Sequence, residues 1–156
     1  IIMEEIKALL TELENKIPHQ ELMNTLVSKS SVGWHIEHAL LTMNLVLESI
    51  HKSNPENYKR TFNLNRILVF TLNKIPRGKV KAPRAVRPNE DFNTDSLISH
   101  LEKGKTNLEK LNALSANHYF EHPFMGYLNL KATIRFIKIH TNHHLNIIKE
   151  IIESKN

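Results

Sequence analysis

Helix-breaking residues are scarce in this chain, and most of the prolines gather in one segment. The 156 residues include 4 glycines and 6 prolines. Pro55, Pro76, Pro83 and Pro88 all lie between positions 55 and 88. Long stretches without these residues can form uninterrupted helices, because proline removes a helical hydrogen bond and glycine is costly to order. The distribution therefore favours a few long helices joined by one long irregular connection.

Four segments carry apolar residues at the three- and four-residue spacing of a helix. They run from about 3 to 16, from about 31 to 52, from about 93 to 111, and from about 129 almost to the end. Ser30 or Ser31 can cap the second helix and Asn93 or Thr94 the third, since these side chains accept hydrogen bonds from free N–H groups. A shorter apolar piece at 64–72 predicts a minor helix within the connection. No segment alternates apolar and polar residues for long enough to predict a strand.

These segments predict an all-α fold, a four-helix bundle formed by one domain over residues 1–156. The first two helices are joined by about 14 residues and the last two by about 16. The second and third are joined by about 40, a crossover at about 54–93. Short connections favour antiparallel neighbours, whereas a long one can make its two helices parallel. We therefore expect up-down-down-up order.

The positive charge of the chain is concentrated in this crossover. The net charge is +5, yet residues 57–89 hold nine basic residues and no acidic one, while the rest of the chain carries 12 basic and 16 acidic residues. The segment is a solvated connection, a surface for nucleic acid or another polyanion, or a lid that contacts an anionic substrate. It holds few aromatic residues and no recognisable nucleic-acid motif, so we do not expect a nucleic-acid partner.

Cysteine is absent from the sequence. Its absence excludes disulfides, thiolate zinc sites, iron–sulfur clusters and cysteine nucleophiles. It also fits the reducing cytoplasm, where we expect the protein. No apolar run approaches the roughly 20 residues of a membrane-spanning helix, so we expect no membrane partner.

The chain contains ten histidines, and two of them share a helical face. His140 and His144 are four residues apart in the last predicted helix, about 5–6 Å apart at Cβ. Ile137 and Ile148 lie on the same face, whereas His143 lies to one side. An unpartnered polar group in an apolar stripe costs free energy. A divalent metal ion would partner both imidazoles.

The second predicted helix offers a third ligand. Trp34, His38 and Leu41 form its apolar stripe, whereas we expect His35 to lie off this stripe, to one side of it. If this helix is a neighbour of the last one, three imidazoles converge. Three neutral nitrogen ligands leave an open coordination position, which is typical of a reactive metal site. The alternative is that each histidine is an ordinary core residue with a hydrogen-bond partner.

Three further side chains are candidates for the surroundings of such a site. Glu37 could orient a ligand or act as a base, although a solvated helix face is the alternative. His122 could approach from the loop before the last helix. It is four residues from His118, but Pro123 disfavours helix there, so we do not expect these two to share a helical face. His143 is the third candidate.

Short motifs in three places resemble one known family. The run Ser-Val-Gly-Trp-His-Ile-Glu-His at 31–38 is similar to helix two of DinB-like proteins. The His-Pro-Phe at 122–124 and the Ile-His-Thr-Asn-His-His at 139–144 are similar to their last loop and fourth helix. These proteins, with the YfiT-like proteins, are metal-binding four-helix bundles. The chain resembles a branch of unknown function from about residue 20 to its end. The resemblance implies that His38, His140 and His144 hold the metal.

The resemblance also implies an activity class. Characterised relatives are transferases that use a low-molecular-weight thiol, whose thiolate form the metal would favour. Arg84 and Arg87 of the crossover would then bind the carboxylates of the thiol. Many thiol-using relatives follow the second histidine of the last helix with Arg-Gly, whereas Leu145 and Asn146 follow it here. A metal-bound water would serve a hydrolase instead.

We therefore predict a metal-dependent enzyme of transferase or hydrolase type that acts on a small molecule; its catalytic side chains are not identified by the sequence. Zinc or nickel suits three imidazoles best, with iron or manganese as alternatives. Two other functions stay open. One is a polyanion- or nucleic-acid-binding module that uses residues 59–87. The other is a metal-stabilised protein without turnover that pairs into a homodimer through exposed helix faces.

Overall fold

The computed structural model describes residues 2–78 and 81–154 and is mostly helical. Its five α-helices in that part of the chain are α1 (Ile2–Lys16), α2 (Val32–Lys52), α3 (Leu64–Leu72), α4 (Thr94–Glu109) and α5 (Leu130–Glu153). Short 3₁₀ turns lie at Ile17–His19 (η1), Pro55–Asn57 (η2), Arg84–Val86 (η3) and Lys110–Ala113 (η4). None of the helices in these ranges has an apolar stretch long enough to span a lipid bilayer.

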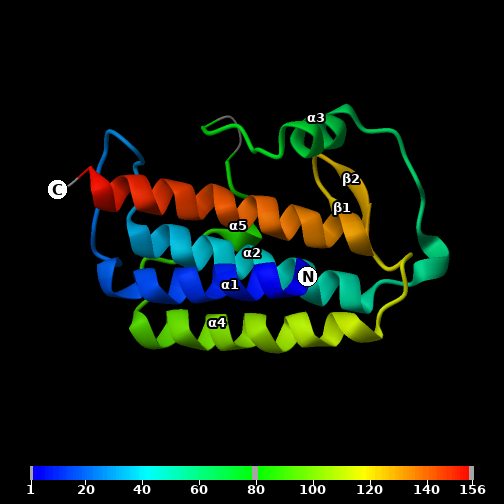
Figure 1. The fold of residues 1–156 in the computed structure, drawn as a ribbon, viewed down its shortest axis with the longest axis horizontal. Helices are drawn as coiled ribbons and strands as arrows, with labels where there is room; N and C mark the ends of the chain where they lie inside the picture. The colour runs from blue at the N-terminus through cyan, green and yellow to red at the C-terminus, as the bar shows by residue number, and fades with distance from the viewer. Residues whose placement is uncertain (1, 79–80, 155–156) are drawn as a thin grey trace.

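Four long helices lie side by side (Figure 1). α2 packs against α4 and α5, and α1 packs against the same two helices. α2 and α4 run in one direction, whereas α1 and α5 run in the other (Figure 1). The buried side chains between them are mainly aliphatic, among them Ile6, Leu10, Leu13, Ile36, Leu40, Leu97, Leu101 and Ile148. The long connection between α2 and α4 is therefore a crossover that lets these two helices run parallel.

Side chains cap three of the long helices where the sequence predicted their starts. Ser31 Oγ accepts a hydrogen bond from the Trp34 N–H at 3.1 Å at the start of α2. Asn93 and Ser96 form a reciprocal capping box at the start of α4. Asn129 caps α5 through its side-chain oxygen. Each cap satisfies an N–H group that the first helical turn leaves free, and the predicted starts are confirmed.

The prediction of an all-α fold is wrong, because a small antiparallel hairpin precedes α5. β1 (Tyr119–His122) pairs with β2 (Gly126–Asn129), in the region that the sequence predicted to be a loop before the last helix. Each strand has four residues, too few for an alternating pattern to be recognised. Gly126 has a φ of 69°, in the left-handed region that favours glycine.

The crossover carries α3 at the predicted position, and α3 rests on the hairpin. The side chains of Asn63 and Asn65 donate hydrogen bonds to the Phe124 carbonyl at 3.1 and 3.2 Å. The Arg66 guanidinium donates to the Tyr127 carbonyl at 3.1 Å. Several apolar side chains of this helix stay exposed, namely Leu64, Ile67, Leu68 and Leu72. Hydrogen bonds to the hairpin therefore anchor α3 while much of its apolar surface faces outward.

Two contacts fasten the later part of the crossover to the long helices. Arg77 forms a two-point ion pair with Glu150 of α5, with N–O distances of 2.8 and 2.7 Å. Val86 of η3 is buried, and its carbonyl accepts a hydrogen bond from a side chain of α2. The crossover therefore lies against both α5 and α2.

Two buried glycines are predicted to respond oppositely to alanine. A Cβ at Gly33 in α2 would overlap the Phe92 ring and approach Gln20 Cβ to 3.1 Å, whereas a Cβ at Gly104 in α4 meets its nearest described neighbours at 3.7 Å. We expect Gly33→Ala to lower the free energy of unfolding by about 1–3 kcal/mol through overpacking. Gly104→Ala should raise it by up to about 1 kcal/mol, because alanine is the better helix former. Urea denaturation measures both, and an equal loss in the two variants would contradict this assignment.

Candidate metal centre

Three histidines from two helices converge between α2 and α5. His38 belongs to α2, His140 and His144 belong to α5, and one ring nitrogen of each lies within 4.8 Å of the other two. The ring centroid of His38 lies 5.1 Å from that of His140 and 4.6 Å from that of His144. The centroids of His140 and His144 are 4.7 Å apart. His38 and His144 are buried and His140 is half-buried. The structure thus brings together the three histidines that the sequence singled out.

A backbone carbonyl fixes the proton of His38. Its Nδ1 lies 2.8 Å from the Val86 carbonyl oxygen in η3. A carbonyl oxygen can only accept, so Nδ1 carries the hydrogen and donates it. The Trp34 indole stacks on the same imidazole, with ring centroids 5.1 Å apart and an interplanar angle of 19°. The second nitrogen of His38, Nε2, therefore keeps its lone pair.

A second histidine of α2 contacts His144. The Nδ1 of buried His35 lies 2.9 Å from the Nδ1 of His144. The Nε2 of His35 lies 2.8 Å from Ser28 Oγ, in the loop before α2. The expectation that His35 faces to the side is wrong, because positions 35 and 38 are three residues apart and both face α5. This spacing was the signal that could have found it.

Burial keeps these imidazoles neutral. It is the largest cause that lowers the pKa of His35, to about 4, and the charge of His38 adds to it. Burial also lowers the pKa of His38, although the hydrogen bond to Val86 opposes this. The pKa values of His140 and His144 lie well below 6.5 for the same main cause. Neutral imidazole is the form that binds a divalent metal.

Glu37, a sequence candidate for this site, faces a different helix. Its buried carboxylate accepts a hydrogen bond at Oε2 from His100 Nδ1 of α4 at 3.0 Å, and its Oε1 lies 2.8 Å from the same nitrogen. Glu37 therefore contributes to the packing of α2 on α4, whereas the three histidines lie between α2 and α5.

His122 lies at the edge of the site, in β1. Its Nδ1 accepts hydrogen bonds from the N–H groups of Phe124 and Met125 at 3.0 and 3.2 Å. Its ring lies 4.8 Å from the Phe136 ring, which is 5.5 Å from the His140 ring. Burial lowers the pKa of His122 to about 4. The Phe136 ring is therefore a neighbour of both His122 and His140.

The remaining candidates lie on the crossover side. The His143 ring is 4.9 Å from the His144 ring and lies near the backbone of Ile75 in the crossover. Burial is the main cause that lowers the pKa of His143 to about 4. Arg84 and Arg87 are exposed and flank Val86, whose carbonyl holds His38. Both arginines are therefore close in sequence to the segment that covers this part of α2.

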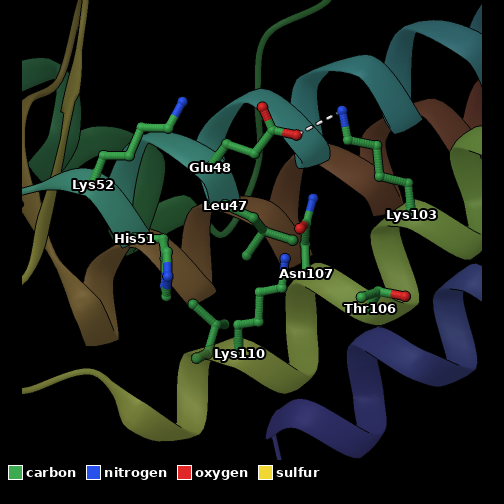
Figure 2. Close-up of a pocket in the computed structure, with 9 residues that line it drawn as sticks. Leu47, Glu48, His51, Lys52, Lys103, Thr106, Asn107 and Lys110 are labelled. Atoms are coloured by element: carbon green, nitrogen blue, oxygen red, sulfur yellow. Dashed lines mark ion pairs between the residues drawn. The ribbon is translucent and has the colours of Figure 1, made fainter.

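A cavity of the structure lies elsewhere. It has a volume of about 400 Å³ and lies between α2 and α4, where Figure 2 shows the ion pair between Glu48 and Lys103 at 2.6 Å. Leu47, which lines it, is nine residues beyond His38, roughly 13 Å along the helix. None of the three converging histidines is among the described residues that line it. Of the three histidines, His38 and His144 are buried and His140 is half-buried.

The lowered pKa values predict a pH-dependent stability. The pKa values of His35, His122 and His143 are about 4 in the folded protein, against about 6.5 in an unfolded chain. The unfolded chain therefore binds protons first as the pH falls. The free energy of unfolding of the metal-free protein should be greatest above pH 6.5 and decline between pH 6.5 and about 4.

Thermal melts across this pH range check the decline. His122→Gln should make it shallower, whereas His51→Gln, at an exposed position of α2, should leave it unchanged. A melting temperature that stays constant from pH 7 to below pH 5 would contradict the assignment.

Comparison with known proteins identifies the family of the chain. A family model with the description "Protein of unknown function (DUF1569)" matches residues 7–151. The curated proteins and the solved structures returned no match. The matched range includes His38, His140 and His144 as well as the hairpin and the crossover. The chain therefore belongs to the DUF1569 family.

Proposed function

We propose that this protein is a metal-dependent enzyme in which His38, His140 and His144 hold one divalent ion. The observation that supports the proposal is that a nitrogen of each ring lies within 4.8 Å of the other two. Two nitrogens bound to one zinc ion at about 2.0–2.1 Å can be at most about 4.2 Å apart. Small side-chain rotations would therefore close this set around an ion.

The surroundings of the three rings fit a ligand set. The imidazoles have lowered pKa values, so they need not lose a proton to bind a metal at neutral pH. His38 already donates its Nδ1 hydrogen to Val86, which leaves Nε2 for the ion. Zinc or nickel suits such a nitrogen set. When bound, the ion would supply a Lewis acid with an open position for a water or a thiol.

Hydrolysis of a small molecule is the reaction class that we propose first. The resemblance to DinB-like proteins supports both thiol transfer and hydrolysis. Leu145 and Asn146 stand here where many thiol-using relatives have Arg-Gly, which favours hydrolysis, and thiol transfer is the second candidate. Arg84 and Arg87 are exposed beside Val86, and we propose that they contact an anionic group of the substrate.

Polyanion binding through residues 59–87 has weaker support. Several cations of this segment have partners within the protein. Arg77 is paired with Glu150, and Arg66 donates to the carbonyls of Tyr127 and Thr61. The Glu150 carboxylate offsets the charge of Arg77, and the two carbonyls occupy donors of Arg66. Both side chains are therefore less available to a polyanion, whose phosphates are neutralised by free lysines and arginines.

Metal analysis of the untagged protein tests the proposal. We expect about one equivalent of zinc or nickel per chain in the parent, and none in the His140→Ala/His144→Ala double variant, since one imidazole cannot hold the ion tightly. His51→Ala, at an exposed position of α2, is the control and should keep the metal. A parent protein that contains no metal and takes up neither zinc nor nickel would overturn the site.

Activity screens then separate an enzyme from a metal-stabilised protein. The metal-loaded parent is assayed for ester, amide and phosphoester hydrolysis, and for transfer to low-molecular-weight thiols. We expect a hydrolytic activity that the double variant lacks. If the metal raises the melting temperature but no turnover is found, the non-catalytic alternative is favoured.

A further inference from the structure

We propose that His35 is a positioning residue for the metal centre: it holds His144 in the tautomer that leaves its Nε2 free for the ion, and Ser28 in turn holds His35. The inference rests on the metal site proposed above. Its basis is a chain of two short contacts, 2.9 Å between the Nδ1 atoms of His144 and His35, and 2.8 Å between His35 Nε2 and Ser28 Oγ.

The contact between two Nδ1 atoms restricts where the protons lie. A hydrogen bond between two imidazole nitrogens needs one donor and one acceptor, so one of the two Nδ1 atoms carries a hydrogen and the other does not. His35 occupies the Nδ1 side of His144, so Nε2 is the nitrogen of His144 that remains for a metal. A neutral His144 that gives its Nε2 lone pair to an ion must carry its hydrogen on Nδ1 and donate it to His35.

The position of the hydrogen on His144 then determines the position of the hydrogen on His35 and the direction of its bond to Ser28. His35 accepts at Nδ1, so as a neutral imidazole it carries its own hydrogen on Nε2. That N–H donates to Ser28 Oγ. The three side chains therefore have one arrangement of hydrogens that is compatible with a metal on His144.

Ser28 is held independently of His35. Its Oγ also accepts a hydrogen bond from the Ser30 N–H at 3.1 Å. Its backbone N–H donates to the Asn24 carbonyl at 2.9 Å. The hydroxyl oxygen is thus fixed by the turn before α2, and it presents an acceptor to His35 without rearrangement.

The partner of His144 differs in kind from the usual one. Histidines that bind metals commonly donate their second N–H to a carboxylate or a carbonyl, as His38 does to Val86. His35 is 4% exposed and is bonded at both ring nitrogens, to His144 and to Ser28, so in the arrangement above it accepts at Nδ1 as a neutral ring. It can orient His144 without adding a negative charge next to the ion.

Zinc affinity is the first measurement. Competition with a chromophoric chelator at pH 7.5 gives the Kd of zinc for the parent, His35→Ala, His35→Gln and Ser28→Ala. Loss of a partner behind a metal ligand typically weakens metal binding about 10- to 100-fold, and we expect this for His35→Ala. Ser28→Ala should weaken binding less, because His35 remains. Glutamine can both accept from His144 and donate to Ser28, so His35→Gln should recover part of the affinity.

The matched control is another histidine of the long helices. His100 of α4 is bonded to Glu37 and faces away from the three ligands. His100→Gln keeps a donor for Glu37, and zinc affinity should change less than about twofold, well below the effect of losing a ligand's partner. An equal loss in His100→Gln and His35→Ala would mean a general packing effect and would overturn the inference.

The tautomers of His35 and His144 are a second measurement, because a purely structural role of His35 would not determine which ring nitrogen carries the hydrogen. Long-range ¹H–¹⁵N spectra of the imidazoles in the zinc-loaded parent identify which nitrogen carries each hydrogen. We expect the hydrogen on Nδ1 of His144 and on Nε2 of His35. A hydrogen on Nδ1 of His35 would overturn the inference, and this measurement stands even if His35→Ala does not fold.

The two failures are distinguishable. If the parent binds no zinc, the proposed metal site is wrong and this inference falls with it. If the parent binds zinc and His35→Ala binds it with the same Kd, the metal site stands and only the role of His35 is overturned.

Discussion

The burial of neutral imidazoles between α2 and α5 is the constraint on which the rest of this structure depends. A buried polar group without a partner costs free energy. His38 and His35 avoid this cost through different hydrogen-bond partners. His38 bonds the Val86 carbonyl and His35 bonds Ser28, so the partners come from the two irregular segments on either side of α2. The crossover and the loop before α2 are therefore part of the site and not merely connections.

This dependence explains why the crossover is long and how it runs. Its length lets α2 and α4 run parallel (Figure 1), and on its way it lies against α5 through Arg77 and against α2 through Val86. The antiparallel pairing of α2 and α5 then sets His38 opposite the two histidines of α5. A shorter connection would make α2 and α4 antiparallel neighbours and would not cover His38.

The sequence predicted the long helices, the crossover and the three converging histidines because each leaves a periodic pattern. His140 and His144 are four residues apart in a stripe of isoleucines, and α5 has one buried face that this stripe marks. α2 is different, since it packs against both α4 and α5 and is buried over most of its circumference. A single apolar stripe could not show that His35 faces α5 while Glu37 faces α4. The hairpin escaped prediction because its strands have four residues each.

The carboxylate of Glu37 does not face the three histidines, because this side chain is directed toward α4. Its carboxylate is buried one residue before His38, yet it is bonded to His100 on α4. Among the described residues, the groups beside the three histidines include neutral imidazoles, an indole, a phenyl ring and a carbonyl. The positive charge of Arg77 helps to lower the pKa values of His35 and His143. An ion held by three neutral nitrogens in this environment would keep its full positive charge. Such an ion favours an anion at its open position, whether hydroxide, a thiolate or a charged group of the substrate, and the basic crossover beside it favours the same charge.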